Sequence, residues 1–156
     1  MKIKYLSLFL ILATTFLASA LGGYVTSVYK EPWYSQLVLS PLSPPAWVFG
    51  PVWTTLYVLM SIAVWRVWQV SFNRKILFIY YIHLFFNASW SVIFFGLHNI
   101  LLALINLSLI LFFIIFLMYL YKSIDKLAFY LMIPYIAWST YAFFLNFSIL
   151  ILNLMI

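Results

Sequence analysis

The sequence predicts an all-α fold, a membrane-embedded bundle of five transmembrane helices. Of the 156 residues, 68% are hydrophobic and only 6% are charged, whereas a soluble domain carries about a quarter of its residues as charged side chains. Such a chain uses lipid as its solvent, where only helices and closed barrels satisfy their own backbone hydrogen bonds. The apolar stretches are continuous and near the length of about 20 residues that a spanning helix needs, rather than the roughly 9–11 alternating residues of a barrel strand.

Five apolar stretches account for most of the chain: residues 5–28, 45–70, 76–95, 100–121 and 127–152. The connections after the second, third and fourth stretches are too short to fold separately. We therefore expect residues 1–156 to form a single domain. Only the loop at residues 29–44 is long, and its share of Pro, Ser, Trp and Tyr is typical of a functional loop.

Charge divides the connections between two sides of the membrane. With five spans, the N-terminus and the second and fourth connections share one side, which holds Lys2, Lys4, Arg66, Arg74, Lys75, Lys122 and Lys126. The other side keeps only Lys30, beside Glu31. The positive-inside rule then predicts a cytoplasmic N-terminus and an outward C-terminus, with the loop 29–44 also outside. The net charge of +6 is explained by topology and anionic lipid head groups, and no basic cluster indicates a nucleic-acid partner.

The first span has a second interpretation. Lys2 and Lys4, followed by an apolar run that ends in Ala18-Ser19-Ala20, form the pattern of a cleavable signal peptide. The apolar run continues through Val25 and exceeds the usual signal core of about 7–15 residues. We therefore favour an uncleaved span.

Groups for conventional catalysis are scarce. The only carboxylates, Glu31 and Asp125, fall on opposite sides of the predicted topology and form no catalytic pair. His83 lies within the third span and His98 in an outer turn, with no cysteine in the sequence and no ligand at metal-binding spacing, so no metal site is predicted. For His83 we expect a neutral, hydrogen-bonded histidine; a functional protonatable group within the membrane is the alternative.

Aromatic residues make up 22% of the chain, and part of this excess belongs at bilayer interfaces. Interface anchoring is the expectation for Tyr5, Trp65, Trp68, Tyr80, Tyr119 and Tyr121. Three other groups repeat at helical spacing on one face of a span and mix large rings with polar, small or flexible residues. They are Trp53, Tyr57 and Met60; Asn87, Trp90 and Phe94; and Trp138, Ala142 and Asn146.

These three faces have two explanations. They suit a pocket for a large, flat, mostly apolar ligand, in which rings stack, Ala142 leaves room and amides fix the orientation. They equally suit helix packing, with Asn87 and Asn146 bonded to neighbouring spans, and spacing alone does not separate the two. The outer loop favours the pocket, since a stiff aromatic lid over the same helix ends would be formed by Trp33, Tyr34, Pro41, Pro44 and Pro45.

At these residues the sequence resembles the TspO/MBR family, the tryptophan-rich sensory or translocator proteins that include the peripheral benzodiazepine receptor. The resemblance covers essentially the whole chain and consists of ordered blocks. The blocks are Trp33-Tyr34; PPAWVFGPVWTTLY at residues 44–57 with Met60; NASWS at residues 87–91 with Phe94-Phe95-Gly96; and Pro134-Tyr135 with Trp138, Tyr141-Ala142 and Leu145-Asn146.

The resemblance implies a five-helix bundle, usually a homodimer. It needs no cofactor and binds porphyrins such as protoporphyrin IX or heme, sterols and benzodiazepine-type drugs beneath the first loop. The matching ligand positions are Trp33, Tyr34, Pro44, Trp53, Asn87, Trp138 and Ala142, to which the aromatic faces add Tyr57, Trp90 and Asn146. Some family members are proposed to degrade protoporphyrin with light and oxygen through pocket tryptophans. Trp53 and Trp138 would be the catalytic positions here.

The sequence departs from the family pattern in several places. The family commonly has Lys-Pro and an aromatic residue before its Pro-Pro, but this loop reads LSPLSPP at residues 39–45, which removes a cation that would meet a porphyrin carboxylate. No basic residue follows Lys126, so the cholesterol-recognition pattern is missing, which argues against sterol binding by that element. Ser61 follows the second-span Met60, and the third span lacks a Gly-x-x-x-Gly pair, so the dimer interface is not readable.

We therefore expect a membrane sensor that binds tetrapyrroles or similar flat hydrophobic ligands, in the inner membrane if the source is bacterial. Transport of the ligand ranks second, because the sequence indicates neither inverted repeats nor broken helices. Slow light-dependent degradation of porphyrin is the third alternative and the least favoured, although an indole can act as a redox partner without an acid or a metal.

The topology makes a direct prediction. A reporter that works only in the cytoplasm should be inactive when fused at Ile156, because the charge asymmetry places the C-terminus outside. The same reporter inserted in the turn at residues 73–75 should be active and serves as the control. Activity of the Ile156 fusion would overturn the charge argument.

Overall fold

The computed structural model describes residues 2–154, with side chains from Tyr5 onward. The side chains of Lys2 and Lys4 and the reporter position Ile156 lie outside the described residues. The helices are α1 (Lys2–Tyr29), α2 (Ala46–Ser71), α3 (Arg74–Ser91), the π-helical turn η2 (Val92–Gly96), α4 (Ile100–Ile124), α5 (Lys126–Leu131) and α6 (Ile133–Leu154), with a short 3-10 turn, η1 (Tyr34–Gln36), in the long loop. Five helical segments of this described chain are long and apolar enough to cross a membrane, so the predicted fold class is confirmed.

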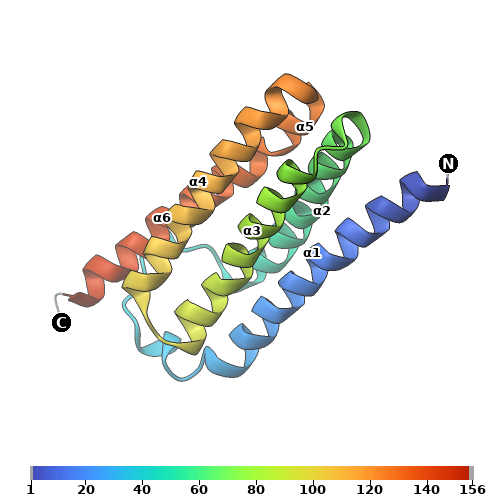
Figure 1. The fold of residues 1–156 in the computed structure, drawn as a ribbon. Coiled ribbons are helices and arrows are strands. Elements are labelled where there is room, and N and C mark those ends of the chain that lie inside the picture. Colours follow the sequence, from blue (N-terminus) through green and yellow to red (C-terminus); the bar gives the residue numbers. More distant parts are fainter. Residues whose placement is uncertain (1, 155–156) are drawn as a thin grey trace.

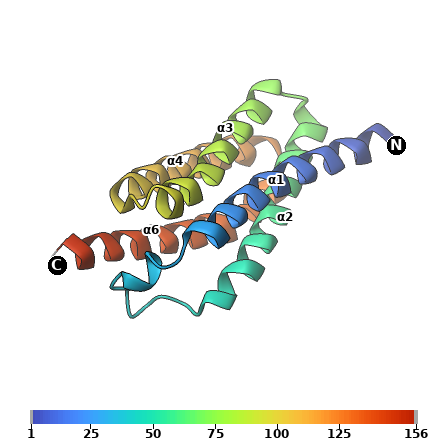
Figure 2. The ribbon, with the colours of Figure 1, turned by 90° about the horizontal axis from the view of Figure 1, so that it is seen from below.

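The helices pack side by side in a bundle. α3 packs against α4, α4 against α6, and α1 along α2 and α3. α1 begins at one end of the bundle and α6 ends at the other (Figure 1). The long loop with η1 closes the end where α6 finishes, and Figure 2 shows the first turns of α2 diverging from α6.

Short polar side chains set where helices begin. Asn73 accepts hydrogen bonds from the backbone N–H groups of Lys75 and Ile76 at 3.0 and 3.4 Å. Asn99 accepts one from Leu102 at 2.9 Å. These caps satisfy backbone donors that the first turn of a helix leaves without partners.

Two of the predicted spans are less regular than expected. The third ends in the π-turn η2, where the N–H of Leu97 bonds the carbonyl of Val92 at 2.9 Å. The fifth is interrupted at Met132, which separates α5 from α6. The reason is Pro134, which has no N–H to continue the α5 hydrogen-bond ladder but fits the first turn of a new helix.

The interface role expected for six aromatic residues is wrong for two of them. Tyr80 and Tyr121 are fully buried in the core, whereas Tyr5 and Tyr119 are exposed on the outside of the bundle. Tyr80 reaches this position because its hydroxyl has a partner there, Thr15 Oγ1 at 2.6 Å. Such a partner offsets the cost of burying a phenol. The Tyr121 hydroxyl is buried without a partner among the described residues.

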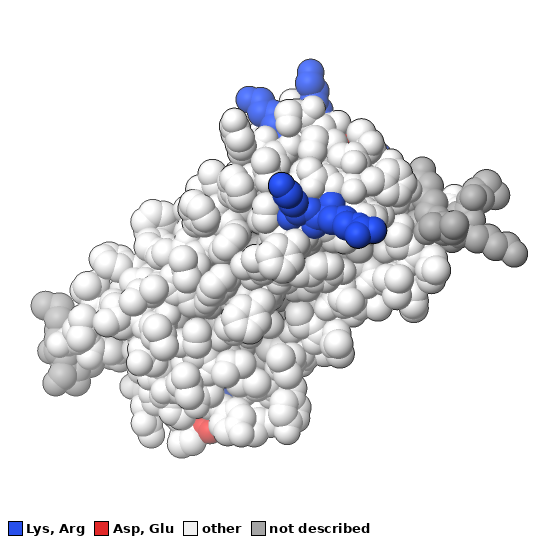
Figure 3. Space-filling view, in the orientation of Figure 1, with Lys and Arg blue, Asp and Glu red and all other residues white. Residues whose placement is uncertain are grey.

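Basic side chains gather at the end of the bundle that holds the α2–α3 and α4–α5 turns (Figure 3). At this end Arg66 pairs with Asp125, with Nη2 and Oδ2 2.8 Å apart. Asp125 also caps α5 by accepting from the Ala128 N–H at 3.0 Å. Burial alone would raise the pKa of the Asp125 carboxyl, but the Ala128 N–H and the Arg66 guanidinium outweigh burial and hold the pKa below its ordinary value of 3.8.

Replacing Asp125 with Asn should keep the cap and lose the ion pair. Because the Arg66 side chain is 37% exposed, we expect the free energy of unfolding to fall by only about 1 kcal/mol at neutral pH. A lowered pKa stabilises the fold above the unfolded-state pKa, so the difference should disappear as the pH falls below 3.8 and through the folded-state pKa.

Thermal unfolding in detergent across this pH range measures the effect. The control is Glu31→Gln, since Glu31 pairs only loosely with Lys30 at 3.8 Å and should not change stability. Equal stability of wild type and Asp125→Asn at neutral pH would show that the pair does not stabilise the fold.

Candidate functional site

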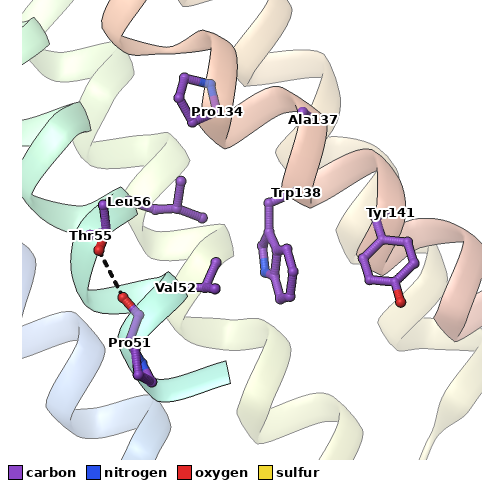
Figure 4. A pocket seen from close by; sticks show the side chains of 8 residues that line it. All are labelled: Pro51, Val52, Thr55, Leu56, Pro134, Ala137, Trp138 and Tyr141. Carbon is purple, nitrogen blue, oxygen red and sulfur yellow. Dashed lines mark hydrogen bonds between the residues drawn. The ribbon is translucent and has the colours of Figure 1, made fainter. Parts of the chain in front are cut away.

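A cavity of about 530 Å³ lies between α2 and α6. Its walls are Pro51, Val52, Thr55 and Leu56 of α2 and Pro134, Ala137, Trp138 and Tyr141 of α6 (Figure 4). The volume falls in the range of about 300–1,000 Å³ that is typical of small-molecule sites. Both walls belong to membrane spans, so the cavity lies at the depth of the bilayer.

Side-chain shape explains why the cavity is not filled. Pro51 lies inside α2 and Pro134 in the first turn of α6, and compact rings therefore stand on both walls. Ala137 adds only a methyl group on the α6 side. The indole of Trp138 projects from α6 toward α2 and is the largest side chain in the walls (Figure 4).

The cavity walls present few free polar groups. The Thr55 hydroxyl donates to the Pro51 carbonyl of its own helix at 2.9 Å, and the Tyr141 hydroxyl donates to the Leu42 carbonyl at 2.5 Å. The Trp138 Nε1–H is buried and has no hydrogen-bond partner among the described residues. The site therefore offers apolar surface and one unpaired indole donor.

The long loop is fixed to the ends of the helices by named contacts. Asn153 near the end of α6 bonds both backbone groups of Val38, with Oδ1 accepting from its N–H and Nδ2 donating to its carbonyl, each at 3.0 Å. Trp33 stacks on His98, with ring centroids 4.5 Å apart. Together with the Tyr141–Leu42 bond, these contacts hold the loop at both its start and its end.

Four predicted site residues gather in an outer aromatic cluster around Phe94. Trp33 and Tyr34 meet this ring at centroid distances of 5.3 and 6.3 Å, and Trp90 stacks on it at 4.9 Å. The Trp90 Nε1–H donates to Asn146 Oδ1 at 3.2 Å. Here Asn146 acts as a bond between helices, and the aromatic rings connect the loop to η2.

A second group of predicted residues forms a buried hydrogen-bond chain, hereafter the Tyr57–His83 chain. The Tyr57 hydroxyl donates to Asn87 Oδ1 at 2.8 Å, and Asn87 Nδ2 donates to the Tyr135 hydroxyl at 2.8 Å. The Tyr135 hydroxyl lies 2.7 Å from His83 Nε2. Trp53 stacks on Tyr57 with ring centroids 5.5 Å apart. His83 thus makes the hydrogen bond expected of it.

Of the ten residues predicted to bind ligand, only Trp138 lines the cavity. Pro44 and Ala142 are half-buried and outside its walls, and the others lie in the outer cluster or along the Tyr57–His83 chain. Sequence reasoning missed the wall residues Pro51, Val52, Thr55, Leu56, Pro134, Ala137 and Tyr141. Their signal was present in helical spacing, because Pro134, Trp138 and Tyr141 are separated by four and three residues. This face lacks the amide that, together with aromatic rings, marked the predicted site.

The comparison with known proteins gives the family. The TspO/MBR family profile matches residues 9–152. The chain belongs to the TspO/MBR family. It is an integral, multi-pass membrane protein, with the five spans described above.

Three relatives are similar over most of their length. The chain is 36% identical to the tryptophan-rich sensory protein of Cereibacter sphaeroides over 141 residues, which cover 89% of each chain. It is 33% identical to the tryptophan-rich protein TspO of Chlorobaculum tepidum over 142 residues, 88% of this chain and 90% of the relative. It is 34% identical to the translocator protein of Homo sapiens over 142 residues, 85% of this chain and 84% of the relative.

The Asn153 contact predicts how firmly the loop is held. Asn153→Ala removes both hydrogen bonds to Val38, and we expect a loss of about 1–2 kcal/mol, or on the order of tenfold faster amide exchange around residues 37–42. Hydrogen exchange measured by mass spectrometry checks this. The matched control is Asn73→Ala at the opposite end of the bundle, which should leave exchange of the loop unchanged. Equal exchange in wild type and Asn153→Ala would show that other contacts alone hold the loop.

Proposed function

We propose that this chain binds porphyrins and similar flat hydrophobic ligands in the cavity between α2 and α6, and acts as a membrane sensor of such compounds. The observation that carries the proposal is the cavity itself, with its apolar walls and the indole of Trp138 projecting into it. A flat ring system stacks on an indole and buries apolar surface on the facing wall. The word "sensory" in the name of the Cereibacter sphaeroides relative agrees with a sensing role.

The depth of the cavity indicates how a ligand enters. Because both walls are membrane spans, a hydrophobic molecule dissolved in the bilayer reaches the cavity sideways, without passing through water. Tyr141 of the cavity wall bonds the loop at Leu42, while no residue of the loop itself lines the cavity. The site therefore favours ligands that partition into membranes.

The walls also indicate what part of a porphyrin they accept. Among the residues whose side chains are described, no lysine or arginine lines the cavity. Lys30 is engaged elsewhere, 3.8 Å from Glu31 and 5.0 Å from the centre of the Tyr34 ring. The propionates of a porphyrin would stay at the depth of the lipid head groups, while the macrocycle occupies the cavity. An acceptor atom on the ring edge would satisfy the Trp138 N–H, which is buried and has no partner among the described residues.

Transport is the second candidate, and the interruption of the fifth span at Met132 is the observation that favours it. The sequence has no inverted repeat to support alternating access. Uptake of porphyrin into proteoliposomes, compared with empty vesicles, decides between the two functions. The homodimer that the family resemblance implies, and the inner-membrane location expected for a bacterial source, stay predictions.

Protoporphyrin should quench the intrinsic tryptophan fluorescence of the purified protein. Trp138→Ala removes a stacking surface and a donor, so we expect the affinity to fall by about 1–2 kcal/mol, roughly 5–30-fold. Fluorescence titration in detergent measures the dissociation constant.

The matched control is Trp47→Ala, since Trp47 lies in the first turn of α2 but is 76% exposed and outside the cavity walls. Its affinity should equal that of wild type. Unchanged binding in Trp138→Ala, or in the double variant Trp53→Ala, Trp138→Ala, would place the ligand elsewhere.

A further inference from the structure

At its His83 end, the Tyr57–His83 chain contains a tyrosine–histidine contact that ligand binding does not use. Tyr135 and His83 are both completely buried, and the phenol oxygen lies 2.7 Å from His83 Nε2. The other ring nitrogen, Nδ1, is buried without a hydrogen-bond partner among the described residues. A tyrosine with a histidine at this distance has a proton acceptor in place for its hydroxyl proton.

The donor-to-acceptor direction of the hydrogen bonds in the Tyr57–His83 chain places the hydroxyl proton of Tyr135 between Tyr135 and His83. Asn87 Nδ2 donates to the Tyr135 oxygen at 2.8 Å, while Asn87 Oδ1 accepts from Tyr57. The Ser139 hydroxyl also lies near Tyr135, but it makes no hydrogen bond with acceptable geometry among the described residues. Of the two partners within hydrogen-bond distance, Asn87 Nδ2 and His83 Nε2, only His83 Nε2 can accept. The Tyr135 proton therefore points at His83, which then carries its own proton on Nδ1.

Tyr135 is also in ring contact with a tryptophan. The Trp53 ring meets it edge-on, with centroids 6.3 Å apart and the planes at 71°, a distance typical of aromatic rings in contact. Tyr135 lies one helical turn before Trp138, the indole in the cavity wall. An electron donor with a proton acceptor attached thus lies directly beside one indole and near another.

We propose that Tyr135 and His83 form a redox pair that returns an electron to oxidised Trp53. A light-excited porphyrin removes one electron from Trp53 and leaves the indole radical cation. Without porphyrin, a quinone in the bilayer takes the electron from the light-excited indole and gives the same radical cation. Tyr135 then gives one electron to Trp53 while its phenolic proton moves to His83 Nε2. The products are a neutral indole, a neutral tyrosyl radical and an imidazolium. Electron return from the reduced oxidant to Tyr135, with the proton moving back from His83, restores the starting state.

This transfer keeps the net charge within the membrane unchanged, because one positive charge moves from the indole to the imidazole. That matters in lipid, where creating a new charge is expensive. The result is that Trp53 is repaired before its radical reacts further. The inference rests on the proposed function only for the identity of the natural oxidant.

Two other buried tyrosines lack a proton acceptor of this kind. Tyr57 stacks on Trp53 more closely than Tyr135 does, but its hydroxyl proton goes to an amide oxygen, which is no base. Tyr80 lies 6.2 Å from His83 by ring centroids, and its hydroxyl is bonded to Thr15 at 2.6 Å. The geometry therefore selects Tyr135.

The experiment uses the full chain without porphyrin, in nanodiscs that contain a lipid-soluble quinone. An ultraviolet flash oxidises tryptophan, and transient absorption and electron paramagnetic resonance follow the radicals. In wild type a tyrosyl radical should replace the tryptophan radical, and more slowly after equilibration in D₂O. Tyr135→Phe should lose most of the tyrosyl signal. His83→Gln should slow its formation by about tenfold or more and remove the isotope effect, because the positioned proton acceptor is gone.

Tyr80→Phe is the matched control, since it removes a fully buried phenol beside the same histidine. It should leave the radical yield and the rate at wild-type values. The inference is overturned by a wild-type rate in His83→Gln, by an equal loss of signal in Tyr80→Phe and Tyr135→Phe, or by the absence of an isotope effect in wild type. The isotope comparison needs no variant, so a variant that fails to fold does not leave the question open.

A parallel measurement separates this inference from the proposed function. Protoporphyrin is added to the same nanodiscs, and visible light replaces the ultraviolet flash. A tyrosyl radical in the ligand-free experiment without porphyrin binding would leave the redox pair intact and reject the proposed ligand. Tight porphyrin binding without any Tyr135 radical in either experiment would support the proposed ligand and reject the redox pair.

Discussion

The rest of the structure depends on a small number of polar bonds between helices. In a bilayer the hydrophobic effect does not draw helices together, because lipid is as apolar as their side chains. Asn87 uses both ends of its amide to join α2 to α6 through Tyr57 and Tyr135. Tyr80 joins α3 to α1 through Thr15, and Asn146 joins α6 to Trp90 of α3 and to the Ile100 carbonyl of α4. The cavity lies where the wall residues make no such bond across the gap, since Thr55 bonds its own helix and Tyr141 bonds the loop.

The number of spans could be predicted from the sequence because it follows from the solvent. Long uncharged runs leave the backbone no alternative to helix in lipid, and the observed helices begin and end within a few residues of the expected positions. The interruption at Met132 was not predicted, although Pro134 was visible. A proline fits either a kinked helix or the first turn of a new one, and the choice depends on whether neighbouring groups can satisfy the freed carbonyls.

The site was harder to predict because sequence spacing identifies a face of a helix but not the neighbour that it meets. Trp53 of α2 and Asn87 of α3 each lie on the helix face that the spacing predicted. In the structure, however, both faces meet the Tyr57–His83 chain, and neither residue lines the cavity. Tyr80 illustrates the same limit, because a tyrosine near the start of a span suits a bilayer interface equally well until Thr15 of another helix is seen beside it. A small residue such as Ala137 carries no functional group that would mark it in the sequence as part of a site. The cavity nevertheless depends on such residues, because their side chains leave the space between the helices unfilled.

The three roles of α6 follow from its helical period. Tyr135, Trp138 and Tyr141 are three residues apart, and a step of three residues rotates a side chain by about 60° short of a full turn. The direction therefore changes gradually along the helix, from the Tyr57–His83 chain, to the cavity, to the loop at Leu42. A ligand bound against Trp138, as we propose, would lie within one helical turn of the Tyr135 and Tyr141 side chains. Any displacement of this stretch of α6 by a ligand would reach the bonds of Tyr135 and Tyr141 together, and through them the proposed redox pair and the loop.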